Sequence, residues 1–324
     1  NPSFITFSIQ PFRPHLGNKY GGIWDTRKGG QNVRNTRAYS ILTNPSTRPP
    51  WTEIFMDQKG NPQTREQLLE RFRGRYDYND GTRLGIRGER FTINGEPEFL
   101  YGMSYYGALG ASREHIIQDI ADLKRFGFNW IRVWANWYSY KKDVSCVDGE
   151  GRPREPYFSK LKWLVEECNS NGIIVDITLT RGKDERGNIL FTQESHSRAV
   201  QSITEYLKHY NNWYLDLANE RDVRDNRFVS FDELRIMAEQ ARKIKPGLLI
   251  TASSGNDISK DDIRKYIEYA GVDFICPHRP RNSSSPLQTR SKTIDYLNWI
   301  RELGKTIPVH YQEPFRRGYA DWEP

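Results

Sequence analysis

Two glutamates, Glu220 and Glu313, each end a segment that is expected to be a strand, and the segment before Glu220 has the apolar pattern of a buried one. Glu220 ends W-Y-L-D-L-A-N-E, and Glu313 ends P-V-H-Y-Q-E. Short apolar runs that stop abruptly at polar residues are typical of strands leaving a sheet. Paired carboxylates across a small pocket suit acetal hydrolysis, because a protonated carboxyl helps the leaving oxygen depart while an ionised one attacks or shields the cationic carbon. Either residue alone could instead be a helix cap or a solvated loop residue, so the pairing depends on the elements that position them.

Strand and helix patterns alternate along most of the chain. The strands are expected at 99–106, 129–134, 173–179, 213–219, 248–252, 272–277 and 308–312. The helices between them are expected at 112–126, 158–169, 195–210, 231–244, 261–269 and 292–303. Parallel strands need such intervening helices, whereas antiparallel strands do not. The sequence therefore predicts an α/β fold, a (β/α)8 TIM barrel. A doubly wound open sheet is the alternative, but no G-x-G-x-x-G follows any strand.

The N-terminal quarter of the chain has no such period. Residues 1–85 predict an irregular or accessory region that is itself incomplete, with a short strand in F-I-T-F-S-I and one helix at 64–72. The barrel is expected to occupy residues 86–324, after an entry hairpin that turns at Asn94-Gly95. Because only seven barrel strands are found and closure needs an eighth, we expect truncation after the seventh strand, without the C-terminal strand and helix.

Composition argues against several classes of function. The 48 Lys and Arg residues are interspersed with 41 Asp and Glu residues, so nucleic acid is not the expected partner despite the net charge of +7. No apolar run approaches the roughly 20 residues of a membrane span. The three cysteines form no C-x-x-C and no His has metal-ligand spacing, so neither a metal site nor a cofactor is expected. No signal peptide is visible, which leaves localisation open, with secretion after loss of a leader as one option. The oligomeric state is equally open.

Under a barrel interpretation, polar residues at the C-terminal ends of the strands share one pocket. Arg132, on the second strand, is expected to keep Glu313 ionised, whereas Glu220, beside Asn219 and aromatic residues, would hold a proton. The other residues expected to bind substrate are His278, Tyr106, Trp137 and Tyr311. Each of them has a structural alternative, a hydrogen-bonded loop position for the histidine and a core position for the aromatic residues.

Three further polar residues in the strands are expected to be structural. Asp176 and Asp216 lie in mid-strand, where hydrogen bonding inside the sheet is more common than catalysis. His310 precedes the end of its strand and is expected to face the barrel wall.

From about Gly85 to Pro314 the chain resembles the clan A glycoside hydrolases, and within them the family 5-like cellulase and mannanase barrels. The resemblance rests on the hairpin F-T-I-N-G-E-P-E-F-L-Y-G, on I-R-V-W in the second strand, on L-A-N-E ending the fourth, on a His ending the sixth and on H-Y-Q-E-P ending the seventh. It implies a retaining hydrolase that acts on oligo- or polysaccharides with β-linkages. The matching positions imply that Glu220 is the acid/base and Glu313 the nucleophile, that Asn219 binds the sugar 2-hydroxyl and that Arg132 supports the nucleophile.

The chain departs from the family pattern at three places. The third strand ends in T-L-T-R where the family usually has a His, and R-P follows the His of the sixth strand where a Tyr is usual. A Trp from an eighth strand would lie beyond the end of the chain. Two alternatives therefore stay open, a catalytically inactive carbohydrate-binding or interaction barrel, and a transglycosylase in which a sugar replaces water at the same site.

Overall fold

The computed structural model describes residues 81–139, 141–179, 190–223, 227–280 and 284–314. It also describes the backbone of three two-residue strands, β1 (Ser8–Ile9), β2 (Phe55–Met56) and β3 (Pro62–Gln63), of which β2 and β3 pair with each other. The strand expected in F-I-T-F-S-I corresponds to β1. The helix expected at 64–72 lies outside the described residues, and the boundary at residue 85 stays a prediction.

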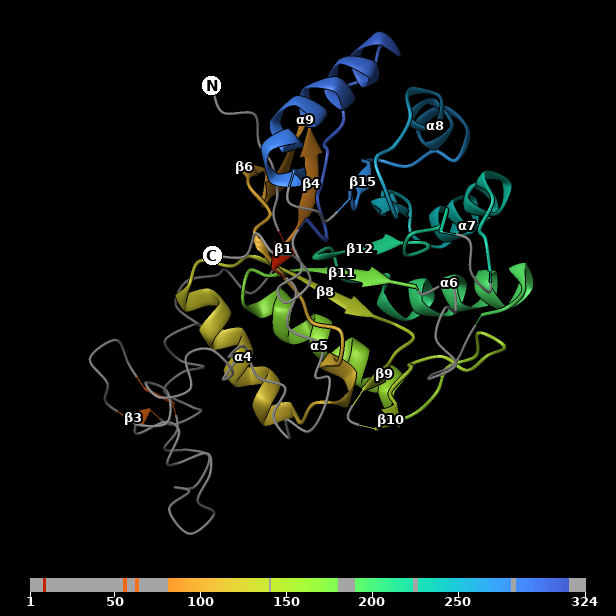
Figure 1. Cartoon of the computed structure of the whole chain (residues 1–324). Helices are drawn as coiled ribbons and strands as arrows, with labels where there is room; N and C mark the ends of the chain where they lie inside the picture. Colours follow the sequence, from red (N-terminus) through yellow and green to blue (C-terminus); the bar gives the residue numbers. More distant parts are fainter. Residues whose placement is uncertain are drawn as a thin grey trace.

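The centre of the fold is a parallel sheet whose strands follow their order in the chain. Its strands are β7 (Gly102–Ser104), β8 (Trp130–Trp134), β11 (Ile174–Thr178), β12 (Trp213–Asp216) and β13 (Ile250–Thr251), with β1 on the free side of β7 (Figure 1). The same order continues through β14 (Ser253–Ser254), which pairs with β15 (Cys276–Pro277), and through a bridge from Ile275 to Val309. This succession confirms the barrel prediction, although the described strands do not close it.

Helices connect successive strands and lie outside them (Figure 1). They are α4 (Arg113–Arg125), α5 (Tyr157–Ser170), α6 (Gln193–Leu207), α7 (Phe231–Ile244), α8 (Lys260–Arg264) with the π-helical turn η4 (Lys265–Tyr269), and α9 (Ser285–Glu302). A 3₁₀ turn, η3 (Ala108–Gly110), precedes α4, and a small hairpin of β9 (Tyr138–Ser139) and β10 (Lys142–Asp143) precedes α5. No helix in the described part of the chain is long and apolar enough to cross a membrane.

Local sequence signals account for the best-predicted elements. Ser230 caps α7 through a capping box with Glu233, and the helix matches its predicted range of 231–244. The entry hairpin consists of β4 (Leu84–Arg87), β5 (Arg90–Ile93) and β6 (Glu96–Glu98). Its turn has φ of 53° at Asn94 and 85° at Gly95, the left-handed pair that an Asn-Gly turn supplies.

Several predicted boundaries differ from the structure, and two elements differ most. Helix α9 begins at Ser285 instead of 292, because Pro286 lies in its first turn, where proline is tolerated, and does not end a loop. The strand expected at 308–312 is reduced to a single bridge at Val309, with hydrogen bonds from Ile275 N to Pro308 O at 3.2 Å and from His310 N to Ile275 O at 2.9 Å. Pro308 has no N–H to extend this ladder.

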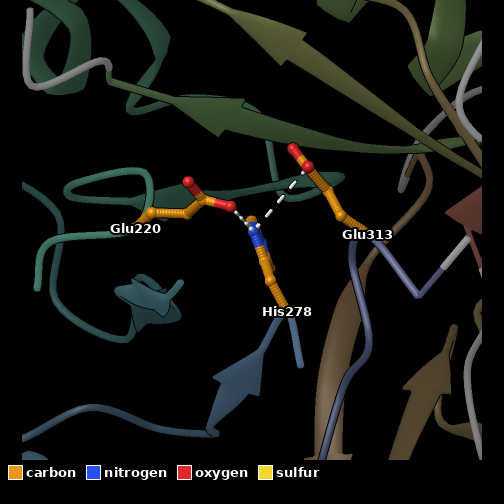
Figure 2. Close-up of side chains that lie close together, drawn as sticks. All are labelled: Glu220, His278 and Glu313. Carbon is orange, nitrogen blue, oxygen red and sulfur yellow. Dashed lines mark hydrogen bonds and ion pairs between the residues drawn. The ribbon is translucent and has the colours of Figure 1, made fainter. Parts of the chain in front are cut away.

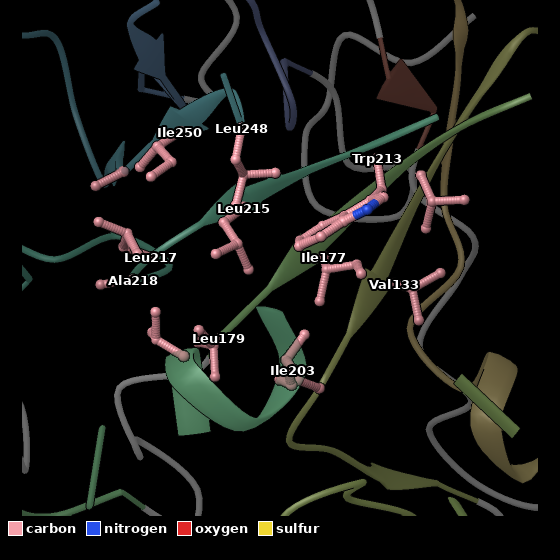
Figure 3. Close-up of a cluster of buried hydrophobic side chains, with 14 of the residues drawn as sticks. Val133, Ile177, Leu179, Ile203, Trp213, Leu215, Leu217, Ala218, Leu248 and Ile250 are labelled. Carbon is pink, nitrogen blue, oxygen red and sulfur yellow. The ribbon is translucent and has the colours of Figure 1, made fainter. Parts of the chain in front are cut away.

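Alternate residues of the strands bury two different apolar clusters. On the helix side, Val133, Ile177, Leu215 and Ile250 pack with Ile203 of α6 (Figure 3). The second cluster lies on the opposite face of the strands and consists of Leu84, Phe91, Leu100, Trp130, Ile174, Tyr214, Phe274 and Cys276. The hairpin contributes Leu84 and Phe91, so this N-terminal hairpin packs against the strands that carry the site.

His310 lies against the aromatic residues of the second cluster. Its ring centroid is 4.8 Å from that of Trp130 and 5.7 Å from that of Phe91. Both ring nitrogens are buried without a hydrogen-bond partner among the described residues. Burial lowers the pKa of His310 to about 3, and Arg132 and His278 act in the same direction. The ring is therefore neutral at all but strongly acidic pH.

Replacing His310 by Leu is expected to stabilise the fold, and more so in mild acid. Leu has a similar volume and leaves no buried nitrogen unpaired, which we expect to raise the free energy of unfolding by about 1 kcal/mol at pH 7. In the unfolded chain a histidine binds a proton below about pH 6.5, whereas folded His310 does not until about pH 3. As pH falls through that window, His310 therefore lowers the free energy of unfolding of the parent protein. His310→Leu lacks this penalty, so its advantage over the parent should be about 2 kcal/mol larger at pH 5 than at pH 7.

Urea denaturation of both proteins at pH 7 and pH 5 measures these two differences. The exposed His209, changed to Gln, serves as the control and should alter neither value. A destabilised His310→Leu with an unchanged pH dependence would contradict the assignment of a neutral, unpaired ring.

Candidate active site

The candidate catalytic residues come from four different strand positions around the barrel. Arg132 is on β8, Glu220 follows β12, His278 follows β15 and Glu313 follows the bridge at Val309. Because these strands are parallel, their C-terminal ends lie at the same end of the barrel. Figure 2 shows the carboxylates of Glu220 and Glu313 on the two sides of the His278 ring. The predicted pairing of the two glutamates is thus present in the structure.

The His278 ring links the two carboxylates. Its Nδ1 lies 3.1 Å from Glu220 Oε1 and 3.8 Å from Glu313 Oε2. One donor atom from each of the three residues lies within 4.8 Å of the others. The side chain of Glu220 is 14% exposed and that of Glu313 only 2%. Glu220 therefore lies toward solvent and Glu313 toward the interior.

Arg132 is fully buried and holds the inner glutamate. Its Nη1 donates to Glu313 Oε1 at 2.5 Å, and its Nη2 donates to Asp216 Oδ2 at 2.8 Å and to Asn219 Oδ1 at 3.0 Å. Burial by itself lowers the pKa of the guanidinium, but the carboxylates of Asp176, Glu313 and Asp216 outweigh it and raise that pKa well above its ordinary value. Arg132 stays charged, so it favours an ionised Glu313 and also fixes the Asn219 amide.

The backbone of Glu220 has an uncommon conformation. Its φ of 45° lies in the left-handed region, which costs energy for a residue with a Cβ atom. The following loop holds it there. Glu220 N donates to Ser253 Oγ at 2.9 Å, and Asp222 accepts from Ser254 Oγ at 2.6 Å and from Gly255 N at 2.8 Å. A Cβ atom on Gly255 would lie 2.2 Å from Val223, so this close approach requires glycine.

A chain of hydrogen bonds fixes the orientation of His278. Gln312 Nε2 donates to Asp176 Oδ2 at 2.6 Å, and Gln312 Oε1 lies 3.2 Å from His278 Nε2. Tyr214 also donates to Asp176 Oδ2, at 2.9 Å, so this carboxylate acts as an acceptor. The Gln312 amide must therefore present its oxygen to the ring, which requires the hydrogen of His278 to be on Nε2. In the neutral ring, the lone pair of Nδ1 then faces the two glutamates.

Aromatic residues form one wall beside Glu313. Tyr106 donates to Glu313 Oε1 at 3.2 Å and stacks on Trp137 with 5.0 Å between the ring centroids. Trp134 contacts both rings, at 5.0 and 4.7 Å. Tyr106 and Trp137 are half-buried, so part of each ring is accessible to a ligand.

The structure places Tyr311 away from the other predicted site residues. Its side chain is fully buried in the helix-side cluster, and its hydroxyl lies 2.9 Å from Thr293 Oγ1 on α9. The prediction that Tyr311 binds substrate is therefore corrected. The period of two in an extended chain explains this, since His310 and Gln312 face the barrel interior while Tyr311, between them, faces outward.

The sequence places Gln312 and Trp134 among the candidates at strand ends but does not single them out as site residues; Gln312 contacts His278, and Trp134 lies in the aromatic wall. The alternation of side chains along 310–312 was the signal that could have identified Gln312 as facing the barrel interior. Asp176 and Asp216 make the structural hydrogen bonds expected of them. Thr180 and Arg181, at the end of the third strand, lie outside the described residues.

In fold, the chain is similar to solved barrels of glycoside hydrolase family 5. A family 5 glycoside hydrolase from Bacteroides vulgatus matches with a TM-score of 0.55 at 14% identity, over 72% of this chain and 53% of that chain. The chain thus spans about half the length of that relative. The catalytic domain of a mannanase from Streptomyces sp. SirexAA-E matches with a TM-score of 0.51 at 17% identity, over 76% and 75% of the two chains.

A third solved structure is a family 5 mannosidase from Rhizomucor miehei in complex with mannosyl-fructose. It matches with a TM-score of 0.50 at 14% identity, over 71% of each chain. No protein-family model matches the sequence, and no curated protein does either. At these identities the comparisons confirm the predicted fold, and function has to be argued from the site.

Proposed function

We propose that the chain is a retaining glycoside hydrolase that cleaves β-linked glycans by double displacement. The observation that carries this proposal is the placement of Glu220 and Glu313, with carboxylate oxygens within 4.8 Å of each other beside His278. Carboxylates this near to each other support a retaining mechanism, in which the two carboxyl groups lie ~5–5.5 Å apart and one of them attacks the sugar directly.

Glu313 is the nucleophile in this proposal. Arg132 and Tyr106 both donate to its Oε1, which favours the ionised carboxylate and orients it. A Glu313 oxygen attacks the anomeric carbon while the bond to the leaving oxygen breaks, and a glycosyl ester of Glu313 forms. The positive charge that develops on the sugar lies next to the buried carboxylate.

Glu220 is the acid/base. It donates its proton to the leaving oxygen in the first step, and in the second step it takes a proton from the water that hydrolyses the ester. With its hydrogen on Nε2, His278 accepts from Glu220 through Nδ1 and so supports the protonated state before the reaction. The position of Glu220 nearer to solvent suits the exchange of a proton and the entry of water.

The substrate contacts follow from the neighbouring residues. Arg132 donates a hydrogen bond to the amide oxygen of Asn219. The amide nitrogen of Asn219 can therefore donate to the sugar 2-hydroxyl. Tyr106 and Trp137 present ring surface on which a pyranose can stack. A mannanase and a mannosidase are among the proteins of similar fold, so β-1,4-linked mannan is the first substrate to test, followed by β-1,4-glucan.

Proton NMR of the first-formed product tests the proposal. The chain is incubated with mannan and glucan oligosaccharides, and we expect the β-anomer to appear before mutarotation. An initial α-anomer would indicate inversion and contradict the double displacement. Glycan binding without turnover would favour the inactive binding barrel, and longer oligosaccharides in place of free reducing sugar would favour the transglycosylase.

A further inference from the structure

We propose that Glu220, His278 and Glu313 also form a binding site for one transition-metal ion of the Zn²⁺ type, and that this ion and a glycan exclude each other. The metal site itself is inferred from ligand atoms and their geometry, whereas the competition with a glycan rests on the proposed function. Figure 2 shows the three side chains converging from different strand ends on one small volume.

The geometry of the donors is close to that of a zinc site. Tetrahedral Zn²⁺ has bonds of about 2.0–2.2 Å to His nitrogen and carboxylate oxygen, which sets neighbouring donors about 3.3 Å apart. His278 Nδ1 lies 3.1 Å from Glu220 Oε1 and 3.8 Å from Glu313 Oε2, and the three donors lie within 4.8 Å of one another. A shift of about 1 Å by the Glu220 side chain completes three coordination bonds, and a water molecule can take the fourth position.

The orientation of His278 is already that of a metal ligand. Histidines that bind zinc donate the hydrogen of their other nitrogen to a fixed acceptor, which aims the coordinating lone pair. Here His278 Nε2 faces Gln312 Oε1, and Gln312 is in turn anchored on Asp176. The lone pair of Nδ1 is thereby directed between the two glutamate carboxylates.

The chemistry of the donors favours a transition metal at this point. Glu220 and Glu313 offer carboxylate oxygens and His278 offers a ring nitrogen. A metal ligand must be deprotonated, so binding of the ion would release the proton that Glu220 holds in the proposed mechanism. The nitrogen donor favours Zn²⁺ over Mg²⁺, which prefers an octahedron of oxygens.

The same geometry sets ion and substrate in competition. The ion would lie between the carboxylate that attacks the anomeric carbon and the one that protonates the leaving oxygen. A sugar positioned for reaction needs that volume, so bound Zn²⁺ blocks it, and a chelator that removes the ion restores access.

Calorimetric titration of the full chain with ZnCl₂, without substrate, tests the site directly. We expect one Zn²⁺ per chain and no comparable binding of MgCl₂. Glu220→Gln and His278→Gln remove a ligand each, and each should weaken Zn²⁺ binding by about 10-fold or more. Gln312→Leu keeps all three ligands but loses the orienting contact, for which we expect a loss of about 10-fold.

His209→Gln is the matched control, because His209 is an exposed histidine outside the site and its loss should leave the affinity unchanged. Circular dichroism verifies that each variant is folded. If His278→Gln does not fold, Glu220→Gln decides alone, since its side chain lies at the solvent side of the site. The proposal is overturned by an absence of stoichiometric Zn²⁺ binding, or by a site affinity that Glu220→Gln leaves unchanged. The Zn²⁺ titration is carried out without substrate, so its result can be interpreted even if the chain has no glycosidase activity.

Discussion

Glu313→Gln is expected to lower kcat by about 10⁴-fold or more, equivalent to about 5 kcal/mol of transition-state stabilisation. The amide has the shape of the carboxylate but carries no charge and is a far weaker nucleophile, so the glycosyl ester cannot form at a useful rate. The fold should survive, because Arg132 keeps its ion pairs with Asp176 and Asp216. Glycan binding should change far less than turnover, since the proposed sugar contacts of Asn219 and Trp137 are retained.

Initial rates with an aryl β-glycoside, together with calorimetric binding of an oligosaccharide, separate these two effects. Glu302→Gln, at an exposed position of α9, is the matched control and should keep full activity. Turnover by Glu313→Gln within tenfold of the parent would remove Glu313 from the mechanism.

Glu220→Ala is expected to have an effect that depends on the leaving group. A natural glycan needs a proton on its leaving oxygen, so its cleavage should slow by about 10³- to 10⁴-fold. The dinitrophenolate group of a dinitrophenyl glycoside leaves without protonation, so formation of the glycosyl ester from this substrate should be affected little. The ester on Glu313 then accumulates, because no base activates the water of the second step.

Added azide sharpens this test. Azide is small enough to enter the space of the missing side chain and needs no general base, so it should accelerate turnover of the dinitrophenyl substrate and give a β-glycosyl azide. Steady-state rates with both substrates, with and without azide, provide the measurement. An equal loss on both substrates and no response to azide would assign Glu220 a structural role.

The sequence predicts most accurately those features that depend on neighbouring residues. The capping box at Ser230 sets the start of α7, and the Asn94-Gly95 pair sets the hairpin turn. The location of Glu220 at a strand end follows from an apolar run that stops abruptly, and that of Glu313 from the regular alternation of strands and helices. The pairing across the barrel follows from topology, since parallel strands place their C-terminal ends together.

Features that depend on distant partners were not predictable in the same way. The hydrogen bond from Gln312 to Asp176 joins residues 136 positions apart, and no local pattern specifies it. The strand at 308–312 shrank to one bridge because strand length depends on which neighbours pair with it. Tyr311 was misplaced because it was selected for its position at the end of the seventh strand, while the alternation of the chain directs its side chain into the core.

The left-handed backbone at Glu220 has a consequence for how this position can change over evolution. At a φ of 45° a glycine is free of the strain that any side chain imposes, whereas catalysis in the proposed mechanism requires a carboxylic acid. Selection for stability and selection for activity therefore act in opposite directions on residue 220. A library of variants screened for thermal stability alone would become enriched in glycine at this position, and the selected proteins would be more stable but catalytically inactive.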